Sequence, residues 1–193
     1  MNNIAIIPAR GGSRRIPHKN TKAFFGKPII AYSIRTALES GLFEKVYVST
    51  DDEVTASVAQ YYGATAIMRH SFYSRDEIGT QEVMQHVLHG LDAQHACCIY
   101  ATCPMLKSED LHDGYRALKK RVARFAFSVG THPLRDAGMF YWGTVKSFIE
   151  GHPLISQESV MVPISENRVC DINTIVDWEQ AEAMYLALTK VTL

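Results

Sequence analysis

Short apolar runs alternate with amphipathic segments along most of this chain. The apolar runs predict strands, because a strand buried on both faces is continuously hydrophobic. Apolar side chains spaced three and four residues apart predict helices. The predicted strands cover residues 4–8, 46–50, 64–68, 96–100, 125–129, 139–142 and 160–164, and the predicted helices cover residues 28–40, 52–62, 81–91, 108–121 and 174–189.

The spacing also assigns buried faces and caps to these helices. In the helix at 52–62 we expect Val54, Val58 and Tyr61 to share the buried face. Ser108 stands where an N-cap is expected, before two acidic residues in the first turn of its helix.

Alternation of strands and helices indicates an α/β fold with a Rossmann-like, mostly parallel sheet and helices on both faces. Ligands of such sheets bind beyond the carboxyl ends of the strands. We therefore expect a site in the loops after Pro8, Thr50, Tyr100 and Val129. No repeat, low-complexity tract or linker interrupts the pattern, so residues 1–193 are expected to form a single domain.

Composition narrows the class of protein without naming a ligand. Hydrophobic residues make up 47% of the chain and charged residues 21%, as in globular domains. The 20 basic and 20 acidic residues balance, which favours neither nucleic acid nor a membrane surface as partner. No apolar run reaches the ~20 residues of a membrane span, and no signal peptide is evident, so we expect a cytoplasmic protein. The four cysteines lack metal-ligand spacing and are expected to be reduced and buried.

The loop after the first strand gathers positive charge in this neutral chain. Residues 7–20 read IPARGGSRRIPHKN, which contains neither GxxxxGK[ST] nor GxGxxG. Its two adjacent glycines allow the backbone to approach a ligand closely. Fixed cations, a hydroxyl and backbone donors are what a triphosphate needs. The alternative is a solvated basic turn. The four cations are Arg10, Arg14, Arg15 and Lys19.

This loop resembles the signature IPARxGSKxxPxKN of the cytidylyltransferases that activate sialic acid, pseudaminic acid and related nonulosonic acids. The runs GKPIIAYSI at 26–34 and VSTDD at 48–52 are also similar to that family. The resemblance implies a nucleotide-diphospho-sugar transferase fold and a CTP site. By matching position it assigns nucleotide binding to Arg10, Gly11, Gly12, Ser13, Arg14, Lys19, Asn20, Arg69, Asp76 and Thr80.

Individual roles follow from the same resemblance. Arg10 and Lys19 would be catalytic, because they would stabilise the charge that develops on the pyrophosphate leaving group. Arg14 stands where the family usually has lysine and keeps the charge on a forked group. Arg69 matches the arginine that reads the cytosine edge, and the alternative for it is a solvated position at a strand end. Asp76 and Thr80 would line the base and ribose pocket.

Two further segments resemble the pseudaminic acid branch of the family. IYATCP at 99–104 is closer to IYPTAP of that branch than to LQPTSP of sialic acid enzymes, and DAGMFYW at 136–142 resembles DAGxFYW. The resemblance implies that Tyr100, Thr102 and Arg135 bind the sugar. Alternatively, Thr102 caps the turn before a proline. Tyr141 and Trp142 are equally well explained as core aromatics.

The run CDINT at 170–174 resembles the family motif DIDT or DINT. Residues two apart on a strand share a face, so Asp171 and Asn173 can converge on one Mg²⁺ ion. The competing role of Asp171 and Thr174 is to cap the last helix, and Asp177 has capping-box spacing from Thr174. His86 and His89 are three residues apart, but no third metal ligand is evident.

One stretch departs from the family. Relatives carry a few dozen residues, an arm that forms the dimer and closes the sugar site, where this chain has only residues 131–135. The resemblance implies a homodimer, and the shortened arm leaves a monomer as the alternative. The implied activity is transfer of CMP from CTP to the anomeric hydroxyl of pseudaminic acid. The alternatives are sialic or legionaminic acid as acceptor, or a nucleotide-binding homologue that has lost turnover.

Overall fold

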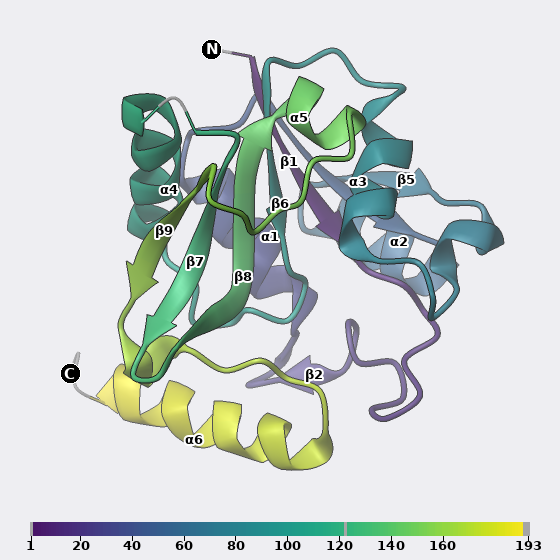
Figure 1. The fold of residues 1–193 in the computed structure, drawn as a ribbon. Coiled ribbons are helices and arrows are strands. Elements are labelled where there is room, and N and C mark those ends of the chain that lie inside the picture. Colours follow the sequence, from purple (N-terminus) through teal and green to yellow (C-terminus); the bar gives the residue numbers. More distant parts are fainter. Residues whose placement is uncertain (1, 122, 191–193) are drawn as a thin grey trace.

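A computed structural model describes residues 2–121 and 123–190, and its centre is a seven-stranded sheet with helices on both faces (Figure 1). The strand order is β5-β4-β1-β6-β8-β7-β9; β8 runs antiparallel to β6 and β7, and the other pairs are parallel. The predicted α/β fold is confirmed. The strands are β1 (Asn3–Pro8), β4 (Lys45–Thr50), β5 (Thr65–Met68), β6 (His95–Ile99), β7 (Phe125–Thr131), β8 (Leu134–Thr144) and β9 (Ser159–Ile164).

The helices lie in two layers, with one helix apart from them. α1, α2 and α4 cover one face of the sheet, α3 and α5 cover the other, and α6 crosses beneath the ends of β7 and β9 (Figure 1). The helices are α1 (Ile30–Glu39), α2 (Glu53–Tyr61), α3 (Thr80–Leu88), α4 (Ser108–Arg121), α5 (Val145–Ile149) and α6 (Ile175–Lys190). The remaining elements are the hairpin β2 (Ala23–Phe24) and β3 (Lys27–Pro28) and the 3₁₀ turns η1 (Ser71–Ser74) and η2 (Glu166–Arg168).

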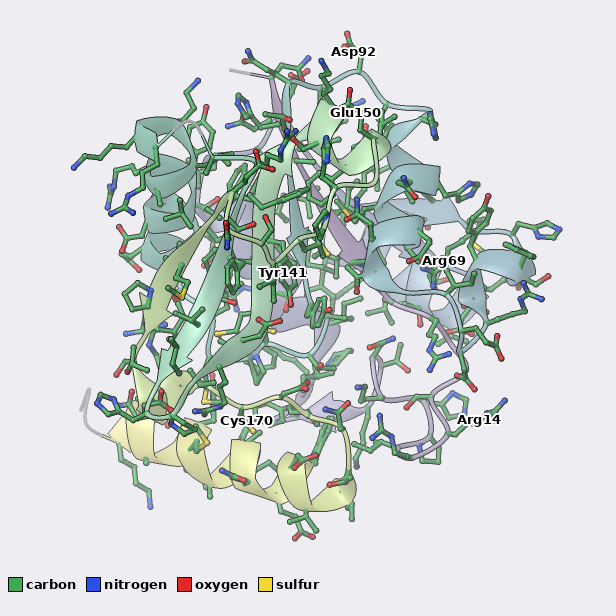
Figure 2. The ribbon with its side chains drawn as sticks, in the orientation of Figure 1. Arg14, Arg69, Asp92, Tyr141, Glu150 and Cys170 are labelled. Atoms are coloured by element: carbon green, nitrogen blue, oxygen red, sulfur yellow. The ribbon has the colours of Figure 1, made fainter. Side chains whose placement is uncertain are left out.

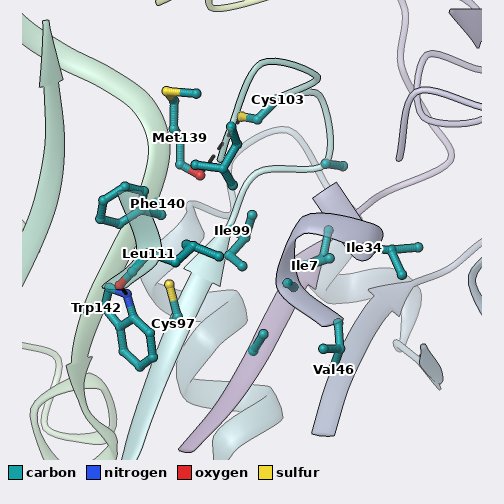
Figure 3. Close-up of a cluster of buried hydrophobic side chains, with 14 of the residues drawn as sticks. Ile7, Ile34, Val46, Cys97, Ile99, Cys103, Leu111, Met139, Phe140 and Trp142 are labelled. Atoms are coloured by element: carbon teal, nitrogen blue, oxygen red, sulfur yellow. Dashed lines mark hydrogen bonds between the residues drawn. The ribbon is translucent and has the colours of Figure 1, made fainter. Parts of the chain in front are cut away.

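Alternation of side chains along the central strands divides the core between the two faces. Cys97 packs with Ile34 and Leu111 on one face, while its neighbour Cys98 packs on the other (Figure 3). Trp142 is fully buried, and its indole N–H donates to the Leu111 carbonyl oxygen at 3.0 Å, so its interpretation as a core aromatic is confirmed. Burial of this apolar surface is the main source of stability for such a sheet.

All four cysteines fall in the described part of the chain and are free thiols, as predicted. Three of them are buried, and burial raises the pKa of Cys97, Cys98 and Cys103 far above the usual thiol value. Among residues 2–121 and 123–190, no helix is both long and apolar enough to cross a bilayer.

Two details of the predicted helices are wrong. Val54 and Tyr61 are 59% and 84% exposed, and α2 instead buries Thr55, Ala56 and Ala59. The helix packs on β4 and on the edge strand β5, where small side chains allow close approach. Ser108 is the first helical residue and not the cap of α4, because its hydroxyl donates to the Thr36 carbonyl oxygen.

A third apolar cluster ties the N-terminal loop to the C-terminal helix. Phe24, from the unpredicted hairpin, is fully buried and packs edge-on against Tyr32, Trp178 and Tyr185. Edge-to-face aromatic pairs of this kind contribute about 1 kcal/mol beyond their buried area. The cluster therefore fixes the loop after β1 next to the segment before α6, although the two are separated by most of the sequence.

Candidate functional site

A cavity of about 570 Å³ opens at the carboxyl ends of β1, β5 and β6, where the sheet topology predicts a ligand site. In the described part of the chain, six cationic and two acidic side chains line it. Such an excess, in a chain without net charge, favours a polyanionic ligand. The cations are Arg10, Arg14, Arg15, Lys19, Arg69 and Arg75, and the acids are Asp76 and Asp171.

The loop after β1 is held across the cavity by ion pairs. The Arg10 guanidinium pairs with Asp76, and Arg14 approaches the other oxygen of the same carboxylate at 3.1 Å. Arg10, through its hydrogen bond and charge, lowers the pKa of Asp76 below its usual value. The structure thus brings Arg10 and Arg14, from the loop after β1, next to Asp76, from the segment before α3. Ser13 lines the same cavity.

Gly11 and Gly12 are not part of the cavity wall. The Gly11 amide donates to the Asp51 carboxylate at 2.9 Å, and a Cβ atom on Gly11 would lie 2.7 Å from Cβ of Asp52. Gly11 is therefore required for close packing on the loop after β4. Asn20 lines the cavity but also holds the loop, since its amide donates to the Arg10 carbonyl oxygen at 2.9 Å.

Lys19 is fixed where the loop after β1 meets the segment before α6. Its ammonium group donates to the Ile172 carbonyl oxygen at 2.8 Å. Burial lowers the pKa of Lys19, and the nearby Asp171 carboxylate partly opposes this shift. The lysine is consequently a positioned, partly desolvated cation that faces the cavity.

Arg69 is buried, with only 6% of its surface exposed, so the alternative of a solvated arginine is wrong. Its Nε donates to the Ser74 hydroxyl at 3.1 Å, and burial lowers the pKa of its guanidinium group. Thr80 and Tyr73 line the cavity beside it, and the Tyr73 ring stacks on His86 with ring centroids 3.9 Å apart. Of the predicted residues, Arg69 and Thr80 therefore both belong to the cavity wall, as does Tyr73.

Asp171 and Asn173 lie side by side in the cavity. The Asn173 amide group donates to the Asp171 carboxylate at 2.6 Å, and its oxygen accepts a hydrogen bond from Arg15 at 3.2 Å. Thr174 and Asp177 form the cap of α6 without Asp171: the Asp177 carboxylate accepts from the Thr174 amide, and the Thr174 hydroxyl accepts from the Asp177 amide. The competing capping role is therefore correct for Thr174 and wrong for Asp171.

The side chains around Asp171 determine whether the expected Mg²⁺ ion could bind there. Within the described residues, no group of three or more His, Cys, Asp and Glu side chains could hold a metal ion. The Asp171 carboxylate fits a magnesium ion that takes its other ligands from phosphate and water, as Mg²⁺ commonly does. The Asn173 amide presents its NH2 group to Asp171 and its oxygen to Arg15, so the amide would have to turn to offer its oxygen to the same ion. His86 is engaged by Tyr73, and His89 is exposed at the end of α3.

The predicted sugar-binding residues are divided by the structure. Tyr100 and Thr102 line the cavity, and burial raises the pKa of Tyr100 to about 12. Arg135 does not line it. Its guanidinium pairs with Glu166 at 3.0 Å, at the tip of the β7–β8 hairpin, and Glu166 also accepts from the backbone amides of Thr131 and His132. The expected ligand loop after Val129 is thus a closed hairpin away from the cavity.

Sequence reasoning missed part of the wall between β5 and α3. Tyr73 and Arg75 line the cavity, and only their place after the carboxyl end of a strand could have indicated it. Arg15 was noted as a cation of the loop without a role, and it contacts Asn173. In Figure 2, Arg14 and Arg69 lie on one side of the molecule, from the loops after β1 and β5, with Tyr141 near the centre.

Comparison with known sequences gives extended matches. A family model described as cytidylyltransferase matches residues 4–163. A pseudaminic acid cytidylyltransferase of Campylobacter jejuni is 36% identical over 224 aligned residues, covering 96% of this chain and 97% of the relative. An N-acylneuraminate cytidylyltransferase of Escherichia coli is 42% identical over 85 residues, 44% of this chain and 20% of the relative. Because the first alignment is longer than the 193 residues of this chain, that relative contains residues that this chain lacks.

Solved structures share the fold at low sequence identity. The structure of a CMP:2-keto-3-deoxy-manno-octonic acid synthetase complexed with CTP superposes with a TM-score of 0.80 at 16% identity, over 97% of this chain and 99% of that one. A 4-diphosphocytidyl-2C-methyl-D-erythritol synthase of Anaerococcus prevotii gives a TM-score of 0.72 at 12% identity, over 96% and 98% of the two chains. The arrangement of the sheet and helices is therefore that of known nucleotidyltransferases.

Proposed function

This chain belongs to the cytidylyltransferase family, and from this premise we propose that it transfers CMP from CTP to the anomeric hydroxyl of pseudaminic acid and releases pyrophosphate. The observation that carries the proposal is the cavity at the strand ends, whose described lining has six cations and two acids. The choice of acceptor rests on the Campylobacter relative, whose match spans almost the full length of both chains.

Catalysis in this scheme is mostly positioning and charge stabilisation. The acceptor hydroxyl attacks the α-phosphorus in line with the departing pyrophosphate. Arg10 and Lys19 stabilise the charge on the leaving group. Both are already oriented, Arg10 by Asp76 and Lys19 by the Ile172 carbonyl oxygen, so little reorganisation is needed as the charge develops.

The pyrimidine base is assigned to the end of the cavity near Arg69. A guanidinium group is a pure donor and suits the oxygen and nitrogen acceptors of the cytosine edge. Its buried setting favours a strong interaction, because few waters compete for its hydrogens. Thr80 also lines the cavity and is assigned to the base and ribose pocket.

Asp171 and Asn173 are the residues that would hold Mg²⁺. When bound, the ion would neutralise part of the negative charge on the phosphate oxygens. Asp171 contributes the formal charge and Asn173 a neutral oxygen. In the structure that oxygen accepts from Arg15 and the NH2 group faces Asp171, so the Asn173 amide would turn when the ion binds.

Pyrophosphate release tests the activity and the acceptor together. The purified protein is mixed with CTP, Mg²⁺ and one of pseudaminic, legionaminic or sialic acid, and a chelator arm tests the metal. We expect the highest kcat/KM with pseudaminic acid, and loss of activity on chelation. Preference for another acid would overturn the acceptor assignment. Protection from heat by CTP, with background release for every acid, would mean a nucleotide-binding homologue without turnover.

Two arginine substitutions, one in the cavity and one outside it, test the role of the cavity. Arg10→Ala should lower kcat/KM by ~100-fold, because it removes one positioned donor to the leaving group. Arg116→Ala, an exposed arginine on α4, is the matched control and should leave activity unchanged. Full activity of Arg10→Ala would contradict the assignment of the loop after β1.

A further inference from the structure

Ser74, the last residue of the 3₁₀ turn η1, contacts two of the arginines that line the cavity. Its hydroxyl accepts a hydrogen bond from Nε of Arg69 at 3.1 Å, and its carbonyl oxygen accepts one from a terminal nitrogen of Arg10 at 3.4 Å. Arg10 is also paired with Asp76, two residues further along the chain. The short segment 74–76 therefore holds arginines from the ends of both β1 and β5.

Ser74 is the partner that orients the Arg69 side chain. The Arg69 backbone amide continues the pairing of β4 and β5, with a hydrogen bond of 2.7 Å to the Thr50 carbonyl oxygen. Among residues 2–121 and 123–190, its guanidinium forms no ion pair, and its two terminal nitrogens form no hydrogen bond. A guanidinium carries five N–H donors in one plane. The bond from Nε to Ser74 thus sets the direction of the other four, which are available to a ligand in the cavity that Arg69 lines.

The turn that carries Ser74 does not need its hydroxyl. A serine at such a place often bonds to nearby backbone and shapes the turn. Here Nδ1 of His70 accepts from the Phe72 amide at 3.2 Å, and the His70 carbonyl oxygen accepts from the Tyr73 amide at 3.0 Å. Within the described part of the chain, the partner of the Ser74 hydroxyl is Arg69.

Ring contacts give the turn a defined position. The Tyr73 ring stacks on His86 of α3, with ring centroids 3.9 Å apart. The Arg75 guanidinium lies 4.0 Å from the centroid of the Phe72 ring, and its Nε donates to the Phe72 carbonyl oxygen at 3.3 Å. Ser74 lies between these two packed residues, so its hydroxyl offers Arg69 a fixed acceptor.

The orientation of Arg69 decides which pyrimidine base it can bind. O2 and N3 of cytosine are both acceptors, whereas N3 of uracil carries a proton and is a donor. Two N–H groups of one guanidinium therefore pair with cytosine, but one of them is left unpaired against uracil. An unpaired donor is unfavourable here, because Arg69 is only 6% exposed. A guanidinium that turned freely would lose this discrimination, since it could reach the uracil oxygens instead.

We propose that Ser74 is a positioning residue for base selection, whose hydroxyl holds Nε of Arg69 so that the terminal nitrogens accept cytosine and reject uracil. This inference rests on the proposed function, in which Arg69 reads the base. Among the described residues that line the cavity Ser74 is absent, so it acts through Arg69 and not on the nucleotide. Loss of the hydroxyl should reduce selectivity for CTP over UTP and leave the phosphate-binding cations in place.

Calorimetric titration with CTP and with UTP, in the presence of Mg²⁺, measures this selectivity without an acceptor sugar. Ser74→Ala should lower the ratio of the Kd for UTP to the Kd for CTP by ~10-fold, which is the loss expected for one hydrogen bond to a charged group. Ser74→Thr keeps the hydroxyl and should keep the wild-type ratio. Ser57→Ala, which removes an exposed hydroxyl on α2, is the matched control.

A second substitution separates positioning from a structural role. Arg69→Ala should remove most of the selectivity, and adding Ser74→Ala should change the ratio no further, because Ser74 acts through Arg69. An unchanged ratio in Ser74→Ala, a further tenfold loss in the Arg69→Ala background, or equal wild-type affinity for both nucleotides would overturn the inference. Circular dichroism of each variant excludes misfolding as the cause of a changed ratio.

The same titrations keep this inference distinct from the proposed function. A wild-type protein that prefers CTP to UTP, but releases pyrophosphate only at background with every acid, would reject the proposed transfer of CMP. The Kd ratios of the variants would still decide the role of Ser74, because they depend on nucleotide binding and not on turnover.

Discussion

At the scale of single residues, Lys19 combines a positive charge, partial burial and a proposed role in stabilising the leaving group. Its ammonium group is half-buried and hydrogen-bonded to the Ile172 carbonyl oxygen. Burial lowers its pKa because the charged form is less well solvated there. Desolvation thus raises the free energy of the charged lysine, and a polyphosphate ligand would lower it by pairing with the ammonium group.

CTP affinity should accordingly depend on alkaline pH. Below the lowered pKa of Lys19 the side chain is charged and binding is at full strength; affinity should fall as the pH rises through that value, which lies below the ordinary 10.5. Calorimetric titration with CTP between pH 7 and about 10 measures this. Lys19→Arg, which stays charged throughout, should remove the pH dependence. Equal affinity of the wild-type protein at both ends of the range would contradict the role of Lys19.

At the scale of elements, α6 fixes one wall of the cavity. The helix begins directly after Asp171 and Asn173, and its first turn is closed by reciprocal hydrogen bonds of Thr174 and Asp177. The backbone amide of Asn173 also donates to the Asp177 carboxylate at 2.9 Å. The cap therefore orients the backbone that carries the proposed metal ligands.

Thr174→Ala should lower the free energy of unfolding by about 1 kcal/mol, because it removes the hydroxyl half of the cap. Urea denaturation followed by circular dichroism is the measurement. Glu179→Ala, an exposed position on the same helix, serves as control and should change stability much less. A Thr174→Ala protein as stable as the control would show that α6 does not depend on its cap.

At the scale of the whole molecule, one nearly buried ion pair joins the C-terminal segment to α4. Arg168, in the 3₁₀ turn η2, donates to both oxygens of Asp110 on α4, and their side chains are 12% and 8% exposed. The Asp110 carboxylate also accepts from the Lys107 amide at 2.9 Å. The pair holds together parts of the chain that are far apart in sequence, near the segment that leads to Asp171.

Removing Arg168 from this ion pair should destabilise the folded protein. Arg168→Leu leaves an unpaired carboxylate in a nearly buried position and should lower the free energy of unfolding by about 3 kcal/mol. Adding Asp110→Asn should recover part of this loss, because the uncompensated charge is then gone. Arg35→Ala, which breaks an exposed pair on α1, should have a much smaller effect in the same urea titrations. An equally small effect of Arg168→Leu would show that the pair is not structural.

The sequence by itself determined the sheet and the chemistry of its first loop. Apolar runs such as 4–8 and 96–100 become strands, because short continuous apolar runs are typical of strands that are buried on both faces of a parallel sheet. Because these strands run parallel, Arg10, Tyr100 and their neighbours lie together at the carboxyl ends of the strands. The cap of Thr174 and Asp177, an alternative raised by their spacing, is formed, whereas the cap predicted at Ser108 is not.

Only the tertiary structure decided which side chains face the cavity. Arg135 reads like a sugar ligand, but Glu166, far from it in sequence, holds it in the hairpin away from the cavity. The contact between Tyr100 and Tyr141 depends on β8 pairing antiparallel with β6. Whether a side chain is buried, which ion pair a charged group forms and how a loop closes all depend on residues that are distant in the chain. A local sequence pattern does not contain those residues.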